Sequence, residues 1–209
     1  MARNAANAAR IVLALAKRPQ DVRRYLAHNG LTRRSPMQLG LPWMPYSVID
    51  FLDGWIDSGT LVYEFGSGGS TLFFARRAGE VVSVEHDEGW ANTVKQQVAD
   101  EGLTNVDLRY VCADFSRPET VADSEFYRAI PVEHADMIVI DSIDHYTHGS
   151  RPVLFHKVEE LIRPGGLVVL DDAWRYRHLR GESNATEFRT FRGVGPGTRR
   201  AQWTDVFFY

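Results

Sequence analysis

Short apolar runs that end in an acidic residue recur along this 209-residue chain. Four of them close on Glu64, Glu85, Asp141 and Asp171. Segments with the apolar spacing of helices separate the runs, and this alternation predicts βαβ units and a parallel sheet in an α/β fold. Because the carboxyl ends of parallel strands share one edge, we expect the four acids along the rim where α/β proteins bind ligands. A row of carboxylates there implies a cationic or donor-rich partner.

The chain divides into two regions by its patterning. Residues 1–59 are predicted to form a helical layer that carries no obvious chemistry and acts as a lid or a dimer interface. Its predicted helices cover 4–18, 21–28 and 47–56. Residues 60–209 form the predicted functional domain. Its predicted strands cover 61–65, 81–85, 106–112, 137–140 and 167–170, with a terminal strand over 201–209.

Composition and charge limit the partners and the location. The formal net charge of -3 argues against a protein that works by neutralising nucleic-acid phosphates. No apolar run approaches the roughly 20 residues of a membrane-spanning helix, and the apolar stretch over 11–16 is too short for a signal peptide. We therefore expect a cytoplasmic protein that binds neither membranes nor nucleic acids. The single cysteine, Cys112, is expected to be buried in a strand.

A glycine-rich turn follows the first predicted strand, where residues 61–70 read Leu-Val-Tyr-Glu-Phe-Gly-Ser-Gly-Gly-Ser. The three glycines permit positive φ and lack Cβ, so a cofactor can touch the main chain. Glu64 would repel a phosphate there and favour a cation or hydroxyl and amine donors. The dinucleotide fingerprint G-x-G-x-x-G is incomplete, because its third glycine falls on Thr71.

The turn resembles the first motif of the class I S-adenosylmethionine-dependent methyltransferases, an acid followed by x-Gly-x-Gly. Glu64, Gly66 and Gly68 match it position by position, and the resemblance extends over residues 58–173. It implies a Rossmann-like, doubly wound sheet of seven mostly parallel strands with a C-terminal antiparallel hairpin, S-adenosylmethionine as cofactor, and a homodimer. The residues that it places on the cofactor are Glu64, Gly66, Ser67, Gly68, Ser70, Glu85, His86, Asp114 and Asp141.

Several of these assignments have a competing interpretation. Glu85 follows the turn at the roughly 20-residue spacing of an acid that binds ribose hydroxyls, or it caps the next helix, although Asp87 is better placed for that. Asp114 matches the family's acceptor for the adenine amine, or it is a turn residue. His86 and Trp90 flank adenine, or Trp90 packs a helix against the sheet.

The segment after the fourth strand constrains the methyl acceptor. Family members that methylate the amines of DNA bases or glutamine carry an Asn- or Asp-Pro-Pro-aromatic motif there, and residues 141–146 hold no proline pair. The segment is more similar to small-molecule O-methyltransferases. In catechol and caffeoyl-CoA O-methyltransferases, acids after the fourth and fifth strands hold a divalent cation. Asp141 and Asp171 match them and Asp172 replaces an Asn, which implies an optional Mg²⁺ that activates a hydroxyl.

A second kinship fits the same segment. Bacterial methyltransferases of antibiotic and glycan tailoring carry Asp-x-x-His-x-Tyr-like stretches, which implies that His145 or His148 accepts the proton beside Asp141. Alternatively, these histidines are surface loop residues. The predicted function is methylation of a small-molecule or sugar hydroxyl. The alternatives are an NAD(P)-dependent oxidoreductase and a non-catalytic module that binds a cofactor or a protein partner.

Overall fold

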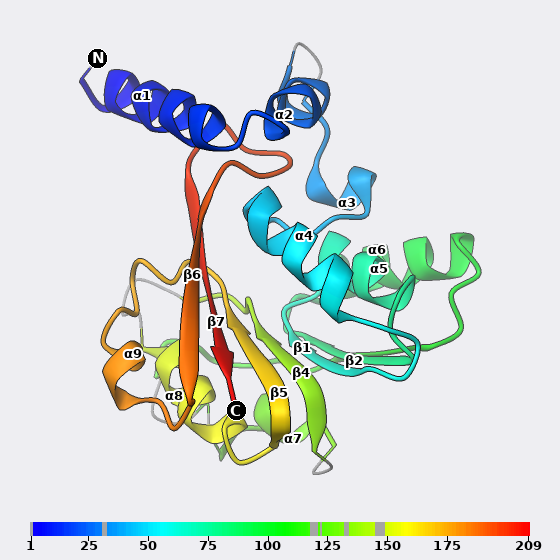
Figure 1. Cartoon of the computed structure of the whole chain (residues 1–209). Helices are drawn as coiled ribbons and strands as arrows, with labels where there is room; N and C mark the ends of the chain where they lie inside the picture. The colour runs from blue at the N-terminus through cyan, green and yellow to red at the C-terminus, as the bar shows by residue number, and fades with distance from the viewer. Residues whose placement is uncertain (1, 31–32, 118–120, 122, 132–133, 145–148) are drawn as a thin grey trace.

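The structure is a computed structural model that describes residues 2–30, 33–117, 121, 123–131, 134–144 and 149–209 (Figure 1). Its centre is a seven-stranded sheet with the strand order β3-β2-β1-β4-β5-β7-β6. The strands are β1 (Leu61–Phe65), β2 (Glu80–Glu85), β3 (Val106–Tyr110), β4 (Ala135–Ile140), β5 (Ile162–Leu170), β6 (Glu187–Gly193) and β7 (Gln202–Phe208). Strands β1 to β5 are parallel, and β7 is antiparallel to both β5 and β6. The predicted Rossmann-like sheet with a terminal hairpin is confirmed.

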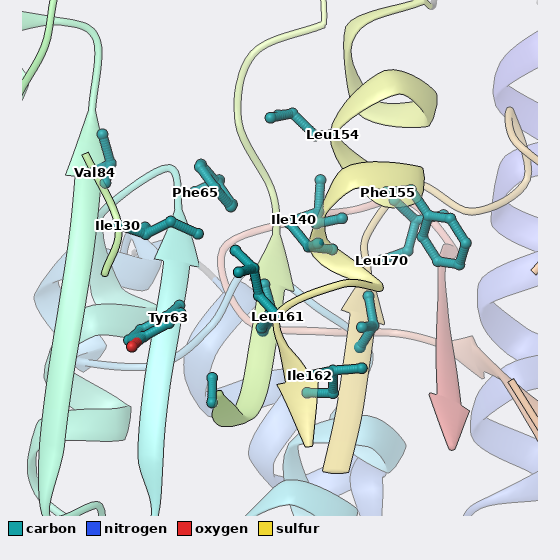
Figure 2. Packing of buried hydrophobic residues seen from close by; sticks show 14 of the residues in the cluster. Tyr63, Phe65, Val84, Ile130, Ile140, Leu154, Phe155, Leu161, Ile162 and Leu170 are labelled. Carbon is teal, nitrogen blue, oxygen red and sulfur yellow. The ribbon is translucent and has the colours of Figure 1, made fainter. Parts of the chain in front are cut away.

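Helices and connecting segments cover both faces of the sheet. The helices are α1 (Ala2–Lys17), α2 (Asp21–Asn29), α3 (Pro36–Leu39), α4 (Tyr46–Trp55), α5 (Gly69–Ala75), α6 (Glu88–Asp100), α7 (Glu125–Arg128), α8 (Ser150–Val158) and α9 (Leu179–Glu182). Successive side chains of a strand point to opposite faces, so β1 contributes residues to two hydrophobic clusters, one on each face of the sheet. Tyr63 and Phe65 belong to the cluster that contains Phe155 of α8, part of which Figure 2 shows, whereas Val62 belongs to the cluster that contains Leu52 of α4.

Two local expectations are wrong. The third strand ends at Tyr110, which pairs with Glu85, and the chain then leaves the sheet. Cys112 is therefore exposed rather than buried in a strand. The N-terminal layer also contains the short helix α3, which the prediction omits. Its capping box is visible in the sequence, since Ser35 accepts a hydrogen bond from the backbone N–H of Gln38 and donates its own N–H to the Gln38 side chain.

The N-terminal helices and the tip of the β6–β7 hairpin meet above the carboxyl edge of the parallel strands (Figure 1). Asn29 donates its side-chain amide to the carbonyl of Gly195 at 3.1 Å. The backbone N–H of Tyr46 donates to Val194 at 2.8 Å. These bonds hold the N-terminal layer, residues 2–59, over the edge where the parallel strands end, and this layer is called the roof below. None of the described helices has the length and apolarity that crossing a membrane requires.

Gly66 places the turn after β1 against the end of β4. Its φ is +100°, in the region that favours glycine. A Cβ added there would lie 2.7 Å from the carbonyl oxygen of Asp141 and 2.9 Å from the backbone nitrogen of Ser142. The turn therefore runs so close to the neighbouring strand that only a residue without a side chain fits.

We predict that Gly66→Ala lowers the free energy of unfolding more than Gly102→Ala does. Gly102 also has a positive φ of +65°, but an added Cβ meets nothing within 4 Å. The control variant thus carries only the left-handed backbone cost of about 1 kcal/mol, whereas Gly66→Ala adds roughly 1–3 kcal/mol of overpacking against backbone. Urea unfolding followed by circular dichroism measures both. Equal losses would contradict the close approach of the turn to β4.

Candidate functional site

A cavity of about 1410 Å³ opens between the carboxyl edge of the parallel strands and the roof. Its lining combines the turn after β1, the ends of β2, β4 and β5, helix α3 and the tip of the β6–β7 hairpin. The sequence-predicted residues that line it are Gly66, Ser67, Gly68, Ser70, Glu85, His86, Asp141, Asp171 and Asp172. The sheet edge therefore brings most of the predicted site into one space.

Glu85 closes β2 and holds the glycine-rich turn in place. Its Oε2 accepts hydrogen bonds from the backbone N–H and the hydroxyl of Ser67, at 2.9 and 3.0 Å. Its Oε1 accepts from the backbone N–H groups of His86 and Asp87, at 2.8 and 3.0 Å. Burial alone would raise the pKa of Glu85, but the bonds from His86, Asp87 and Ser67 outweigh it and lower the pKa below its ordinary value. Among these donors, the Ser67 hydroxyl is the one that can rotate away.

Trp90 and His86 shape the wall beside Glu85. The indole Nε1 of Trp90 donates to the carbonyl of Ser67 at 2.7 Å, so the ring lies along the turn while remaining 40% exposed. Asp87 caps α6 by accepting from the backbone N–H of Trp90 at 2.7 Å. The competing interpretation of Glu85 as the helix cap is therefore wrong. The His86 ring lies with Nδ1 2.8 Å from Glu85 Oε1.

Glu64 lies beneath the turn, and the structure corrects the expectation that it faces the cofactor. Its side chain is fully buried, and hydroxyl groups occupy both carboxylate oxygens. Ser70 donates to Oε1, and Thr71 and Ser83 donate to Oε2 at 2.6 and 2.7 Å. The Ser70 hydroxyl, also expected on the cofactor, is thus committed to Glu64. Burial raises the pKa of Glu64 to about 7, although the three hydroxyl donors oppose the rise.

Asp114 does not line the described cavity, and two other predicted residues are not described by the structure. Asp114 is exposed, and its Oδ1 accepts from the backbone N–H of Ser116 at 2.9 Å, as in a turn. It is not among the lining residues, so its adenine role stays a prediction. His145 and His148 lie outside the described residues. Their role as proton acceptors also stays a prediction.

An arginine that the sequence analysis did not single out lies among the acids at the ends of β4 and β5. Arg151 Nη2 pairs with Asp141 Oδ1 at 3.0 Å, and Nη1 donates to the backbone carbonyl of Asp171 at 2.8 Å. Its Nε donates to the carbonyl of Ser142 at 2.7 Å, and the side chain is only 7% exposed. Its position in the first turn of α8, soon after β4, was the available signal, because helices that follow a strand begin at the carboxyl edge.

The two acids beside Arg151 are strongly perturbed. Burial raises the pKa of Asp141 to about 6, with Arg151 opposing the rise and Asp172 adding to it. Burial and the neighbouring Asp141 also raise the pKa of Asp171 well above its ordinary value. Crowded acids in a cleft are typical of functional sites.

The family follows from the match of a methyltransferase-domain model to residues 63–173, the segment that supplies the sheet edge. The chain belongs to the class I S-adenosylmethionine-dependent methyltransferases. This assignment favours the methyltransferase prediction over the oxidoreductase and non-catalytic alternatives. A comparison with curated protein sequences finds no match.

Solved methyltransferase structures share the fold at low sequence identity. An O-methyltransferase from Bacillus cereus in complex with SAH has a TM-score of 0.60 at 18% identity, covering 88% of this chain and 96% of its own. An rRNA methylase from Streptococcus thermophilus has a TM-score of 0.56 at 15% identity, covering 76% and 92%. A precorrin-6y C5,15-methyltransferase from Geobacter metallireducens has a TM-score of 0.54 at 9% identity, covering 78% and 86%. At these low identities, the three structures show the fold alone.

The acids of this methyltransferase do not fit the expected Mg²⁺ site. Each of the three predicted ligands already has a protein partner. Asp141 pairs with Arg151, Asp171 Oδ1 accepts from the Thr204 hydroxyl at 2.6 Å, and Asp172 pairs with Arg175 at 3.5 Å. Over the described ranges, no group of three His, Cys, Asp or Glu side chains is placed to hold a metal ion. The guanidinium of Arg151 supplies positive charge at this position.

We predict that Glu64→Gln changes how stability depends on pH. The pKa of Glu64 is about 7 in the folded protein and 4.5 in the reference state. Below 4.5 both states hold the proton. As the pH rises towards 7 the unfolded chain ionises first, so the wild-type protein loses about 3 kcal/mol relative to the Gln variant.

Urea unfolding at several pH values between 4 and 8 measures this difference. Glu80→Gln, which changes an exposed glutamate at the start of β2, is the matched control and should leave the pH profile parallel to the wild type. A parallel profile for Glu64→Gln as well would contradict the buried position of its carboxylate.

Proposed function

We propose that this methyltransferase transfers the methyl group of S-adenosylmethionine to a hydroxyl group of a small-molecule acceptor. The observation that carries the proposal is the size of the cavity and its position. At about 1410 Å³ it exceeds the roughly 300–1,000 Å³ of a site for one drug-sized ligand. It therefore has room for the cofactor and an acceptor together above the glycine-rich turn.

The cofactor is proposed to lie along the acidic edge of the cavity. Its ribose hydroxyls donate to Glu85, replacing the Ser67 hydroxyl, which can rotate away while the Ser67 backbone N–H keeps its bond. Adenine lies beside the exposed ring of Trp90. The methionine portion crosses the bare main chain of Gly66 and Gly68, both of which line the cavity.

The acceptor is proposed to approach from the side of Asp141. Its oxygen attacks the methyl carbon in line with the breaking carbon–sulfur bond, and the hydroxyl proton passes to a base of the protein or to water. Fixing this alignment is the main contribution that the protein makes. A hydroxyl is favoured over an amine because no proline pair follows Asp141. His145 and His148 stay candidates for the base.

The oligomeric state, the location and the lack of a nucleic-acid partner are also part of the proposal. The homodimer through residues 1–59 and the cytoplasmic location rest on the sequence. The absence of a nucleic-acid partner rests on the net charge of -3.

We predict that the protein binds S-adenosylhomocysteine and that Glu85→Ala weakens this binding by roughly tenfold or more, since it removes a charged acceptor for the ribose. Titration calorimetry measures both affinities. Glu88→Ala, in the first turn of α6 and outside the cavity lining, should bind like the wild type. Unchanged affinity in a folded Glu85→Ala variant would contradict the proposed cofactor position.

We also predict that excess chelator leaves methyl transfer unchanged, because Arg151 and not a divalent cation balances Asp141. Arg151→Met should lower the rate by roughly tenfold or more by leaving a buried carboxylate without its partner. A radiolabelled methyl-transfer assay on a pool of hydroxylated metabolites, with and without chelator, measures this. Loss of activity with chelator and recovery with Mg²⁺ would contradict the assignment.

A further inference from the structure

The cavity is lined by groups of opposite charge that come from different elements. The acids come from the sheet edge and its adjoining loops and are Glu85, Asp87, Asp141, Asp171 and Asp172. Besides Arg151, the arginines come from the elements that cover this edge: the roof, the segment after β5 and the hairpin tip. They are Arg10, Arg33, Arg175, Arg177 and Arg200. The acids suit the sulfonium and the ribose hydroxyls of the cofactor, and its single carboxylate would occupy only part of this set of arginines.

Within the described part of the chain, most of these arginines have no carboxylate partner. Only Arg175 has one within 4 Å among the residues that the structure describes, and this is Asp172 at 3.5 Å. The Nε of Arg175 is nevertheless buried and has no hydrogen-bond partner there. Arg10, Arg33, Arg177 and Arg200 are exposed, so their N–H donors are open to an anion that enters the cavity.

Tryptophans accompany the arginines. Four of the five tryptophans of the chain line the cavity, namely Trp43, Trp90, Trp174 and Trp203. Trp43 and Trp174 are 55% and 49% exposed. The guanidinium of Arg175 lies 5.2 Å from the centre of the Trp174 ring, and that of Arg177 lies 4.9 Å from Trp203. An arginine above an indole keeps N–H donors free for an anion.

We propose that the acceptor is a ring-bearing small molecule that carries an anionic group, phosphate or carboxylate. The anionic group binds the arginines, the ring lies against the exposed indoles, and the reacting hydroxyl points towards Asp141. This inference rests on the proposed function and names its substrate class. Guanidinium groups match phosphate and carboxylate oxygens with paired N–H donors.

A small anion fits this arrangement better than a nucleic acid does. The cationic groups gather in the lining of one cavity, and the chain as a whole carries a net charge of -3. Proteins that bind nucleic acids neutralise a line of phosphates along an extended surface, and their affinity falls steeply with salt. A cavity with a few arginines instead suits a single charged group.

The test compares matched neutral and anionic probes on protein saturated with S-adenosylhomocysteine. One pair is uridine and uridine diphosphate, and the other is catechol and 3,4-dihydroxybenzoate. Titration calorimetry should give roughly tenfold tighter binding of the anionic member in at least one pair. The pair that shows the preference identifies phosphate or carboxylate as the recognised group.

Two double variants locate the preference. Arg177→Gln/Arg200→Gln should abolish it while S-adenosylhomocysteine still binds, which shows that the protein is folded. Arg23→Gln/Arg128→Gln removes the same charge from exposed positions outside the cavity lining and should keep the preference. If the preference came only from net charge, both double variants would lose it equally, and that result would overturn the site.

Other outcomes separate this inference from the proposed function. Binding of S-adenosylhomocysteine with no preference in either probe pair would overturn the anionic acceptor alone. Failure to bind S-adenosylhomocysteine would overturn the proposed function and this inference with it. Tighter binding of a short single-stranded RNA than of uridine diphosphate would overturn the small-molecule acceptor in favour of a nucleic acid.

Discussion

The packing of the glycine-rich turn between β1 and α5 positions the rest of the site. Gly66 leaves no space for a side chain against the backbone at the end of β4. Beneath the turn, the buried carboxylate of Glu64 accepts hydrogen bonds from hydroxyls on α5 and β2. Beside the turn, Glu85 accepts from the backbone N–H and the hydroxyl of Ser67. The turn is thus fixed from two directions, and its exposed main chain is preorganised for a ligand.

Charge compensation at the sheet edge explains why so many acids can lie together. Glu64 is satisfied by hydroxyls, Glu85 by N–H groups, and Asp141 by the guanidinium of Arg151. The acids therefore have unequal roles, although their positions at strand ends look equivalent. Glu64 stabilises the turn, whereas Glu85 and Asp141 line the cavity. A carboxylate that is buried without a ligand needs such internal donors.

The fold and the acid-lined edge of the sheet could be predicted because they follow from local patterns. Apolar runs gave the strands, and the positions of Glu85 and Gly66 followed from the order of strands along the chain. The direction in which a side chain points could not be predicted in the same way. Glu64 and the turn glycines are close in sequence, yet its carboxylate lies beneath the turn, where hydroxyls of α5 and of Ser83 on the neighbouring strand donate to it.

The positions of the arginines could not be predicted from local patterns either. Arg151 meets Asp141 only because α8 begins at the edge where β4 ends, and Arg10 and Arg200 line one cavity from opposite ends of the chain. Such juxtapositions depend on how the roof and the hairpin tip pack together. A short local motif does not contain this information. The sequence therefore predicted the acid-lined edge but not the cationic groups that line the same cavity.

The most direct test of the central claim is a crystal structure of the protein with S-adenosylhomocysteine. The account predicts that the ligand crosses the main chain of Gly66 and Gly68, that its ribose hydroxyls bind Glu85 with the Ser67 hydroxyl turned away, and that Glu64 keeps its three hydroxyl partners. A ligand that binds elsewhere, or a Glu85 carboxylate still bound only to protein donors, would contradict it.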